Sequence, residues 1–433
     1  MHASTSSSRS LRQTGFTLIE LMVAMTVGLV VIIALMAVTR NYETSKRQVQ
    51  GNAVMGQNIG FVSYDLDRQL RTAGSGFLSS ARDNNPAVAN AIDQPDLTAY
   101  RRALGCTLNV TRSGTQILPR TTAFAAPFAS VPLSVRLIPA LIHAGIGANG
   151  SDVLAIIGGT SGVGEVPIGV RPNGVTFSQV DLLSSVGIKA NDLMLMIETG
   201  QPCMMTQVAS TYASTGTNTA VTLGGTYYAA TSGSVSLSGY ATGLGNPANY
   251  PGGFVTSVLL FGNASGTTPN YPQMRLYGVD TDHQLKAVDL LGNDNGGAVY
   301  PAAENVRDMR ALYGLDTDFD GIVDTWVQPT GSFTVAALTA GTAAAQNNLM
   351  QIRAIRVAML VHSDRIEKTN VSPTTFTLFG DLATALQTTV TISGTDLQRH
   401  FKVVDFTVPL RNAQQLPVID STFTATPISQ IVP

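Results

Sequence analysis

The amino-acid sequence predicts an α+β protein in which a long N-terminal helix, first transmembrane and then stalk-like, precedes a large β-rich globular head. Three observations predict this class. An apolar run without charge covers Leu21–Val38, a helical spacing of apolar residues continues to Leu70, and short strand-like runs follow beyond residue 77. Only 12% of the 433 residues are charged, against roughly 25% in an average soluble domain, which fits a Gly-, Ser- and Thr-rich β protein.

The apolar run reaches the ~18-residue length that indicates a transmembrane helix. Arg9 and Arg12 precede it and no acid occurs before Glu20, which predicts that the first residues stay in the cytoplasm. A secretory signal peptide would have an apolar region of about 7–15 residues and then a small-residue cleavage site, whereas Arg40-Asn41-Tyr42 follows here. An uncleaved anchor is the second alternative, but it does not account for Glu20.

The residues around Glu20 resemble a known processing signal. Gly15-Phe16-Thr17-Leu18-Ile19-Glu20-Leu21-Met22-Val23 resembles the prepilin signal that type IV pilins share with type II secretion pseudopilins. The resemblance implies cleavage between Gly15 and Phe16 by a prepilin peptidase, methylation of Phe16, and a role of Glu20 in assembly. The chemistry agrees, because an unpaired acid in a membrane costs on the order of 2.5–3.5 kcal/mol and the Phe16 ammonium of a neighbouring subunit can neutralise Glu20.

Beyond the apolar run, one helix face is expected to pack on the head. Apolar residues recur at helical spacing at Ile59, Val62, Leu66 and Leu70. Gly74-Ser75-Gly76 then ends the helix. We therefore expect a cleaved leader over 1–15, a transmembrane helix over 16–39, an amphipathic continuation over 40–74 and a β-rich head over 75–433. Three glycines, each costing about 1 kcal/mol relative to Ala, leave a kink or an unwound patch open around Gly51, Gly56 and Gly60.

The head shows strands separated by turn residues. We predict strands over Val153–Ile157, Asp192–Ile197, Phe254–Phe261, Met274–Val279, Gln284–Leu290, 354–361 and Phe401–Leu410. The Gly-, Ser-, Thr- and Ala-rich stretches 210–239 and 330–345 are interpreted as long loops or variable surface decoration. The glycine-rich segment 158–164 is interpreted as a flexible loop, because it lacks the Lys-Ser/Thr ending of a phosphate-binding loop.

Segments toward both ends of the chain, the first of them at the end of the helix, resemble the PilW family of minor pilins. They are Leu66–Gly74 (LDRQLRTAG), Tyr313–Gly321 (YGLDTDFDG), Ile355–Val361 (IRVAMLV) and Val408–Asn412 (VPLRN). Residues 78–300 show little similarity, so we expect an extra subdomain or loops around 100–270. The resemblance implies a minor pilin that helps to initiate and assemble type IV pili in a priming or tip complex. Its partners would be other minor pilins, the major pilin and a tip adhesin. It would lie in the bacterial inner membrane with its head in the periplasm, and later in a pilus at the cell surface.

An acidic segment predicts a calcium site. Asp316, Asp318 and Asp320 precede Gly321 in the D-x-D-x-D-G spacing of a calcium loop, and Asp324 follows at the ninth position. The carbonyl of Ile322 would be a further ligand. The twelfth position is Val327, so the bidentate Glu of an EF-hand is missing. The alternative is an Asp-rich hairpin turn whose side chains bond local amides.

The two cysteines, Cys106 and Cys203, form no metal or redox motif. A disulfide between them is expected if the head is exported. The alternative is a pair of unrelated buried thiols.

No feature predicts an enzyme or nucleic-acid binding. The net charge is −2 and no clustered Lys/Arg stripe occurs beyond the leader, so binding to nucleic acid is not expected. The histidines are scattered, and neither G-x-S-x-G nor H-E-x-x-H occurs, so no catalytic residue is predicted. Two alternatives to a minor pilin stay open, namely a type II secretion pseudopilin and a membrane-anchored adhesive module.

Overall fold

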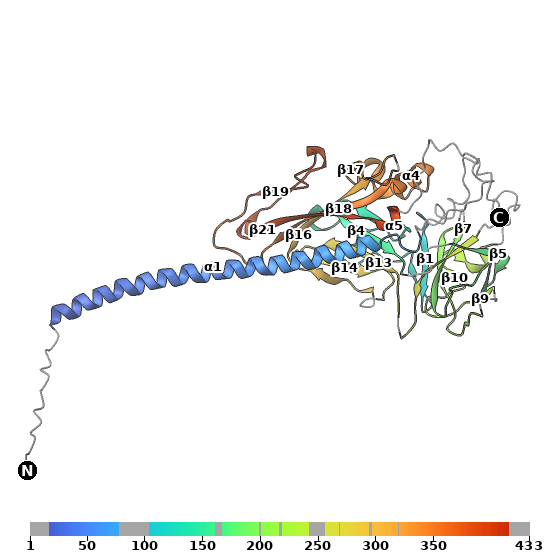
Figure 1. Ribbon diagram of the computed structural model, residues 1–433, viewed down its shortest axis with the longest axis horizontal. Helices are drawn as coiled ribbons and strands as arrows, with labels where there is room; N and C mark the ends of the chain where they lie inside the picture. The colour runs from blue at the N-terminus through green and yellow to red at the C-terminus, as the bar shows by residue number, and fades with distance from the viewer. Residues whose placement is uncertain are drawn as a thin grey trace, which may run out of the picture. The chain divides into compact units, whose positions relative to one another are not determined.

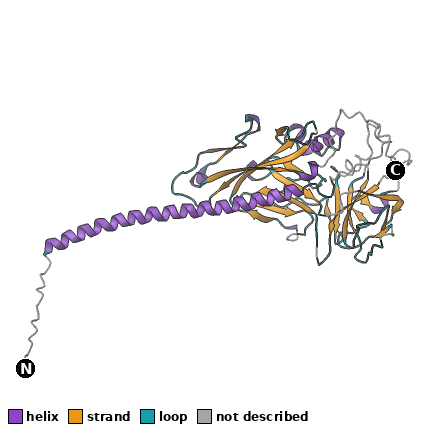
Figure 2. Ribbon diagram, viewed as in Figure 1, coloured by secondary structure: helices purple, strands orange, loops and turns teal. Residues whose placement is uncertain are grey.

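The computed structural model describes residues 17–77, 104–160, 167–198, 201–215, 219–241, 256–267, 269–293, 297–318 and 320–414. The chain forms two compact units, Met1–Val54 and Met55–Pro433. An apolar N-terminal helix is followed by a large β-rich domain (Figure 2), which confirms the predicted α+β class. The domain boundaries predicted from the sequence stay predictions.

The first unit contains the apolar part of helix α1, which spans Leu18–Thr72. Its segment Leu18–Thr39 has a mean hydropathy of 2.9 and is long and apolar enough to cross a membrane. The hydroxyls of Thr26 and Thr39 donate to the carbonyls of Val23 and Leu35, at 2.9 and 2.8 Å. Two polar groups of the apolar segment are thereby satisfied inside the helix, as an apolar environment requires.

The second unit begins with the last part of α1. Val62, Leu66 and Leu70 are buried in its main core, whereas Phe61 and Tyr64 are exposed. This confirms the amphipathic spacing. Gly51, Gly56 and Gly60 are all helical residues of α1, so the helix is not unwound at these glycines.

The helices and strands of the second unit are shown in Figure 1. The strands are β1 Leu108–Arg112, β2 Thr115–Leu118, β3 Ala140–His143, β4 Val153–Gly158, β5 Ile168–Val175, β6 Gln179–Leu182, β7 Asp192–Glu198, β8 Cys203–Gln207, β9 Ala220–Thr222, β10 Thr231–Ser232, β11 Val235–Ser236, β12 Thr256–Asn263, β13 Gln273–Val279, β14 Leu285–Asp289, β15 Tyr300–Ala303, β16 Val306–Leu315, β17 Thr325–Val327, β18 Ile352–His362, β19 Thr375–Leu378, β20 Thr388–Thr391 and β21 Phe401–Pro409. The further α-helices are α3 Val335–Leu338, α4 Ala343–Gln351 and α5 Arg411–Gln414. The 3-10 helices are η2 Ala148–Gly150, η3 Leu237–Gly239, η6 Gly331–Phe333, η7 Thr384–Leu386 and η8 Gly394–Gln398.

Three larger sheets organise these strands. An eight-stranded sheet has the order β2-β1-β8-β7-β12-β5-β6-β9, a five-stranded sheet the order β15-β14-β13-β4-β3, and a four-stranded sheet the order β17-β16-β18-β21. Strand β18 pairs antiparallel with both β16 and β21, whereas β1 and β8 pair in parallel. Two hairpins, β10-β11 and β19-β20, complete the described strands.

The eight-stranded sheet separates two hydrophobic cores. In β7, Leu193, Leu195 and Ile197 belong to the main core, while Met194 and Met196 belong to a second core. This alternation follows from the two-residue period of a strand. The second core draws its buried residues from the range 170–260, within which the sequence predicts part of an extra subdomain.

The predicted strands are found with small shifts at their ends, except that residues 254 and 255 lie outside the described residues. The prediction of long loops over 210–239 and 330–345 is wrong in part. The first stretch contains β9 to β11 and buries Tyr227, and the second contains η6, α3 and the start of α4 and buries Leu338. The hydroxyls of Thr334 and Thr342 cap α3 and α4 by accepting bonds from the amides of Ala337 and Ala345, at 3.3 and 3.2 Å, which favours helices in these Ala-rich runs.

Candidate functional site

The acid of the predicted processing signal lies in the first turn of α1. Glu20 Oε2 accepts bonds from the backbone amide and the hydroxyl of Thr17, each at 2.9 Å. The amide of Glu20 in turn donates to the Thr17 hydroxyl at 3.4 Å. This reciprocal pair is a capping box, which satisfies donors that a helix start leaves free. Its T-x-x-E pattern, from Thr17 to Glu20, is visible in the sequence but is not among the features predicted above.

Glu20 is the one charged residue between Leu18 and Thr39. The predicted cleavage residues Gly15 and Phe16 lie outside the described residues. This segment is therefore an apolar helix that can enter a membrane and that carries one negative charge in its first turn.

The acidic segment 316–324 is the loop of the hairpin between β16 and β17. Leu315 pairs with Thr325 and Tyr313 with Val327 in antiparallel register. The amide of Asp324 donates to the carbonyl of Leu315 at 2.8 Å, so Asp324 lies at the neck of the hairpin beside the residue that precedes Asp316. Val327, at the twelfth position of the loop pattern, lies in β17.

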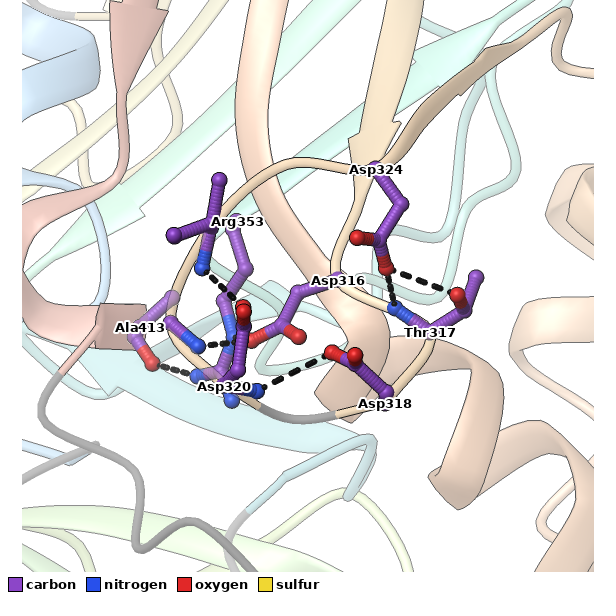
Figure 3. Close-up of polar contacts among 9 residues, drawn as sticks. Asp316, Thr317, Asp318, Asp320, Asp324, Arg353 and Ala413 are labelled. Carbon is purple, nitrogen blue, oxygen red and sulfur yellow. Dashed lines mark hydrogen bonds and ion pairs between the residues drawn. The ribbon is translucent and has the colours of Figure 1, made fainter.

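Asp316 is fully buried at the base of this loop. Its Oδ2 accepts a bond from Arg353 Nε at 2.9 Å and another from the amide of Gly321 at 3.0 Å. Gly321 has a φ of 92°, a left-handed conformation that a glycine adopts without steric cost. Arg353, also buried, donates a further bond to the carbonyl of Ala413 in α5 (Figure 3). The other oxygen of Asp316, Oδ1, is buried and has no hydrogen-bond partner.

The remaining loop acids are exposed. Asp318, Asp320 and Asp324 accept bonds from loop amides, those of Asp320, Ile322 and Thr317, at 3.2, 2.7 and 2.6 Å. The Thr317 hydroxyl donates to Asp324 Oδ2 at 2.7 Å, and the bonds from Thr317 lower the pKa of Asp324. This carboxylate is therefore ionised at neutral pH.

Three of these side chains converge. Carboxylate oxygens of Asp316, Asp318 and Asp324 lie within 4.8 Å of one another. Within the described part of the chain, they are the one such group of three or more His, Cys, Asp or Glu side chains. Asp320, a further predicted ligand, lies outside this group and instead accepts a bond from the Ile322 amide. The predicted role of the Ile322 carbonyl stays a prediction.

The two cysteines lie together at the paired strands β1 and β8 of the eight-stranded sheet. Cys106 and Cys203 are joined as a disulfide with 5.7 Å between their Cα atoms. Cys203 is fully buried in β8, which pairs with β1 just after Cys106. The bridge therefore links two neighbouring segments that are 97 residues apart in sequence.

Two of the histidines that look scattered in the sequence are in contact. His283 Nδ1 and His362 Nε2 lie 3.0 Å apart. Burial lowers the pKa of His362 to about 4 and also lowers the pKa of His283. Both rings are therefore expected to be neutral at pH 7, one donating to the other. Because the two residues are 79 positions apart, no local sequence pattern predicts that they pair.

Two family models match the chain. The model described as a prokaryotic N-terminal methylation motif matches residues 10–36, which contain Gly15, Phe16 and Glu20. The model described as type IV pilus-assembly protein W matches residues 274–412, which contain the acidic loop and Arg353. No curated protein and no solved structure matches the chain significantly.

Proposed function

We propose that this chain, a PilW-like type IV pilin by its two family matches, acts as a minor pilin that helps to initiate and assemble a type IV pilus. The observation that carries the proposal is the single acid, Glu20, in the first turn of an otherwise uncharged 18–39 segment. We place the chain in a priming or tip complex with other minor pilins, the major pilin and an adhesin. Its role there is structural and not catalytic.

The proposed sequence of events follows from the charges. The apolar segment inserts into the inner membrane with the β-rich domain on the periplasmic side. A prepilin peptidase cuts after Gly15, and the ammonium of Phe16, methylated and still positive, becomes the N-terminus. An unpaired Glu20 in the membrane costs on the order of 2.5–3.5 kcal/mol. Pairing with the Phe16 ammonium of an adjacent subunit removes that cost, so assembly is favoured over the isolated subunit.

A type II secretion pseudopilin would use the same processing signal. The match to the pilus-assembly family over residues 274–412 favours the pilus. This segment lies far from the processing signal in sequence, so the match does not depend on the signal that pilins and pseudopilins share. The pilus assignment therefore rests on the second half of the β-rich domain.

Cleavage is tested by mass spectrometry of the mature N-terminus from piliated cells. We expect a methylated Phe16 at the first position. An intact Met1 in cells with active peptidase would contradict the proposed processing.

Assembly is tested with Glu20→Ala. The variant is expected to insert into the membrane and to be cleaved, because the apolar segment and Gly15 are unchanged, but to be lost from complexes with other minor pilins. Thr17→Ala is the matched control, because it removes the two capping contacts of the Thr17 hydroxyl and keeps the charge of Glu20. Normal co-purification of Glu20→Ala with partner pilins would overturn the pairing role. Equal loss in both variants would show that the capping box matters and not the charge.

A further inference from the structure

The hairpin loop between β16 and β17 holds more negative charge than its surroundings neutralise. Four carboxylates lie within the nine residues 316–324. Arg353 offers one positive charge, to Asp316, at 2.9 Å. Among the residues that the structure describes, no Lys, Arg or His forms an ion pair with Asp318, Asp320 or Asp324. Like charges at this density repel one another, so a cation would stabilise the loop.

Asp316 provides an independent indication of a ligand. Its side chain has no exposed surface, yet Oδ1 has no hydrogen-bond partner. A buried oxygen without a partner is rare and destabilising. In Figure 3 this oxygen points toward the carboxylate of Asp318, away from the contacts to Arg353 and Gly321. The unsatisfied acceptor is therefore directed into the acidic cluster.

The spacing of the carboxylates fits one calcium ion. Oxygens of Asp316, Asp318 and Asp324 lie within 4.8 Å of one another. Two oxygens on opposite sides of one Ca²⁺ are about 4.6–5.2 Å apart, twice the usual Ca–O distance of about 2.3–2.6 Å. All three ligands are hard oxygens, which suits Ca²⁺ better than a transition metal.

The loop is held in this arrangement before any ion binds. The strand pairing of Leu315 with Thr325 closes its neck, and the bond from the Gly321 amide to Asp316, at 3.0 Å, fastens its tip to its base. Binding then requires little reorganisation, which limits its entropic cost.

We propose that this loop binds one Ca²⁺ through the carboxylates of Asp316, Asp318 and Asp324, with water filling the remaining coordination positions. The site differs from an EF-hand, because the loop ends in strand β17 and the twelfth position is Val327. Without a bidentate Glu the expected dissociation constant is about 10⁻⁴–10⁻³ M, the range of extracellular calcium modules. The ion would stabilise the base of the hairpin, where Asp316 forms an ion pair with Arg353 and Arg353 donates a hydrogen bond to the carbonyl of Ala413. This inference does not rest on the proposed function.

The direct test is calorimetric titration of the full chain, purified in detergent and stripped with EGTA, with CaCl₂. We expect one site, and with 10 mM Ca²⁺ a rise in Tm of about 2–4 °C. Mg²⁺ at the same concentration should bind more weakly, because it requires near-ideal octahedral geometry. Absence of Ca²⁺ binding by the wild-type chain would overturn the proposal.

The test variant is Asp318→Asn with Asp324→Asn. Both residues are exposed, so the variant keeps the buried pair of Asp316 and Arg353 and should fold, with a Tm in EGTA near that of wild type. It should lose both the calorimetric binding and the calcium-dependent rise in Tm. Asp282→Asn is the matched control, an exposed acid in the turn between β13 and β14, and should keep both. Binding by the double variant that equals wild type would also overturn the proposal.

Discussion

The side-chain amide of Asn412 donates a hydrogen bond to the backbone carbonyl of Ala73 at 3.0 Å and a longer one to that of Thr72 at 3.4 Å. These carbonyls stand at the end of α1, where a helix leaves its last acceptors without partners inside the helix. On the other side, the amide of Gly74 donates to the carbonyl of Ile157 in β4 at 2.8 Å. The end of α1 is therefore held by α5 and by the five-stranded sheet.

Replacement of Asn412 should loosen this attachment. Asn412→Ala removes the donor and should lower the free energy of unfolding by about 1 kcal/mol. Asn412→Asp keeps the size but places a negative charge beside carbonyls at the negative end of the helix dipole, so it should destabilise more. Thermal unfolding of the full chain measures the order wild type, Ala, Asp. An Asp variant as stable as wild type would show that the contact contributes nothing.

Gly158 permits the close approach of β4 to the end of α1. A Cβ at this position would lie 2.4 Å from the carbonyl oxygen of Thr72, a backbone atom. Gly158→Ala should therefore cost about 1–3 kcal/mol, the usual range for overpacking. Gly266→Ala is the control, because a Cβ there meets nothing within 4 Å. Equal Tm values for the two variants would contradict the close packing.

The parts of the fold that the sequence predicts are those with local periodicity. The spacing of Val62, Leu66 and Leu70 repeats over a few residues, and the structure buries these side chains as expected. The strand predicted over 354–361 likewise lies within β18. The sequence predicts a flexible loop over the glycine-rich segment 158–164. Its first residue, Gly158, instead ends β4 and allows a close contact with Thr72, 86 positions earlier, which no local pattern reports.

In the candidate site, too, local patterns predict what neighbouring residues form but not the contacts between distant residues. The D-x-D-x-D-G spacing predicts the acidic turn, because neighbouring residues form it. The partner of Asp316 is Arg353, 37 positions later, and only the pairing of β16 with β18 brings the two together. Which acids converge also depends on the hairpin register, which the spacing does not report. The spacing therefore predicts Asp320 as a ligand, whereas among the described residues the structure groups Asp316, Asp318 and Asp324.

The disulfide is expected to stabilise the β-rich domain. It would close a loop of 97 residues, which in the chain-entropy model contributes about 4–5 kcal/mol, with smaller values common in practice. Changing both cysteines to Ala should lower the Tm by several degrees. Thiol labelling of the denatured, unreduced wild-type protein should find no free thiol. Two reactive thiols would contradict the pairing, and an unchanged Tm of the double variant would contradict its contribution to stability.

Buried His143 should make stability depend on pH. This residue ends β3 with 6% of its surface exposed, and burial lowers its pKa to about 4 from an ordinary value of about 6.5. Between those two values the unfolded chain binds more protons at this position than the folded chain. Its contribution is therefore fully present above about pH 6.5 and is lost as the pH falls toward about 4.

His143→Gln removes this titration, so its Tm should fall less than that of wild type between pH 7 and pH 4.5. The difference corresponds to a free energy on the order of 3 kcal/mol for the full shift. Asp152 and Asp308, whose pKa values are raised by burial, act in the opposite direction but are present in both proteins. The difference between the two curves therefore isolates His143. Parallel curves over this range would show that His143 takes up a proton in the folded state as readily as in the unfolded chain.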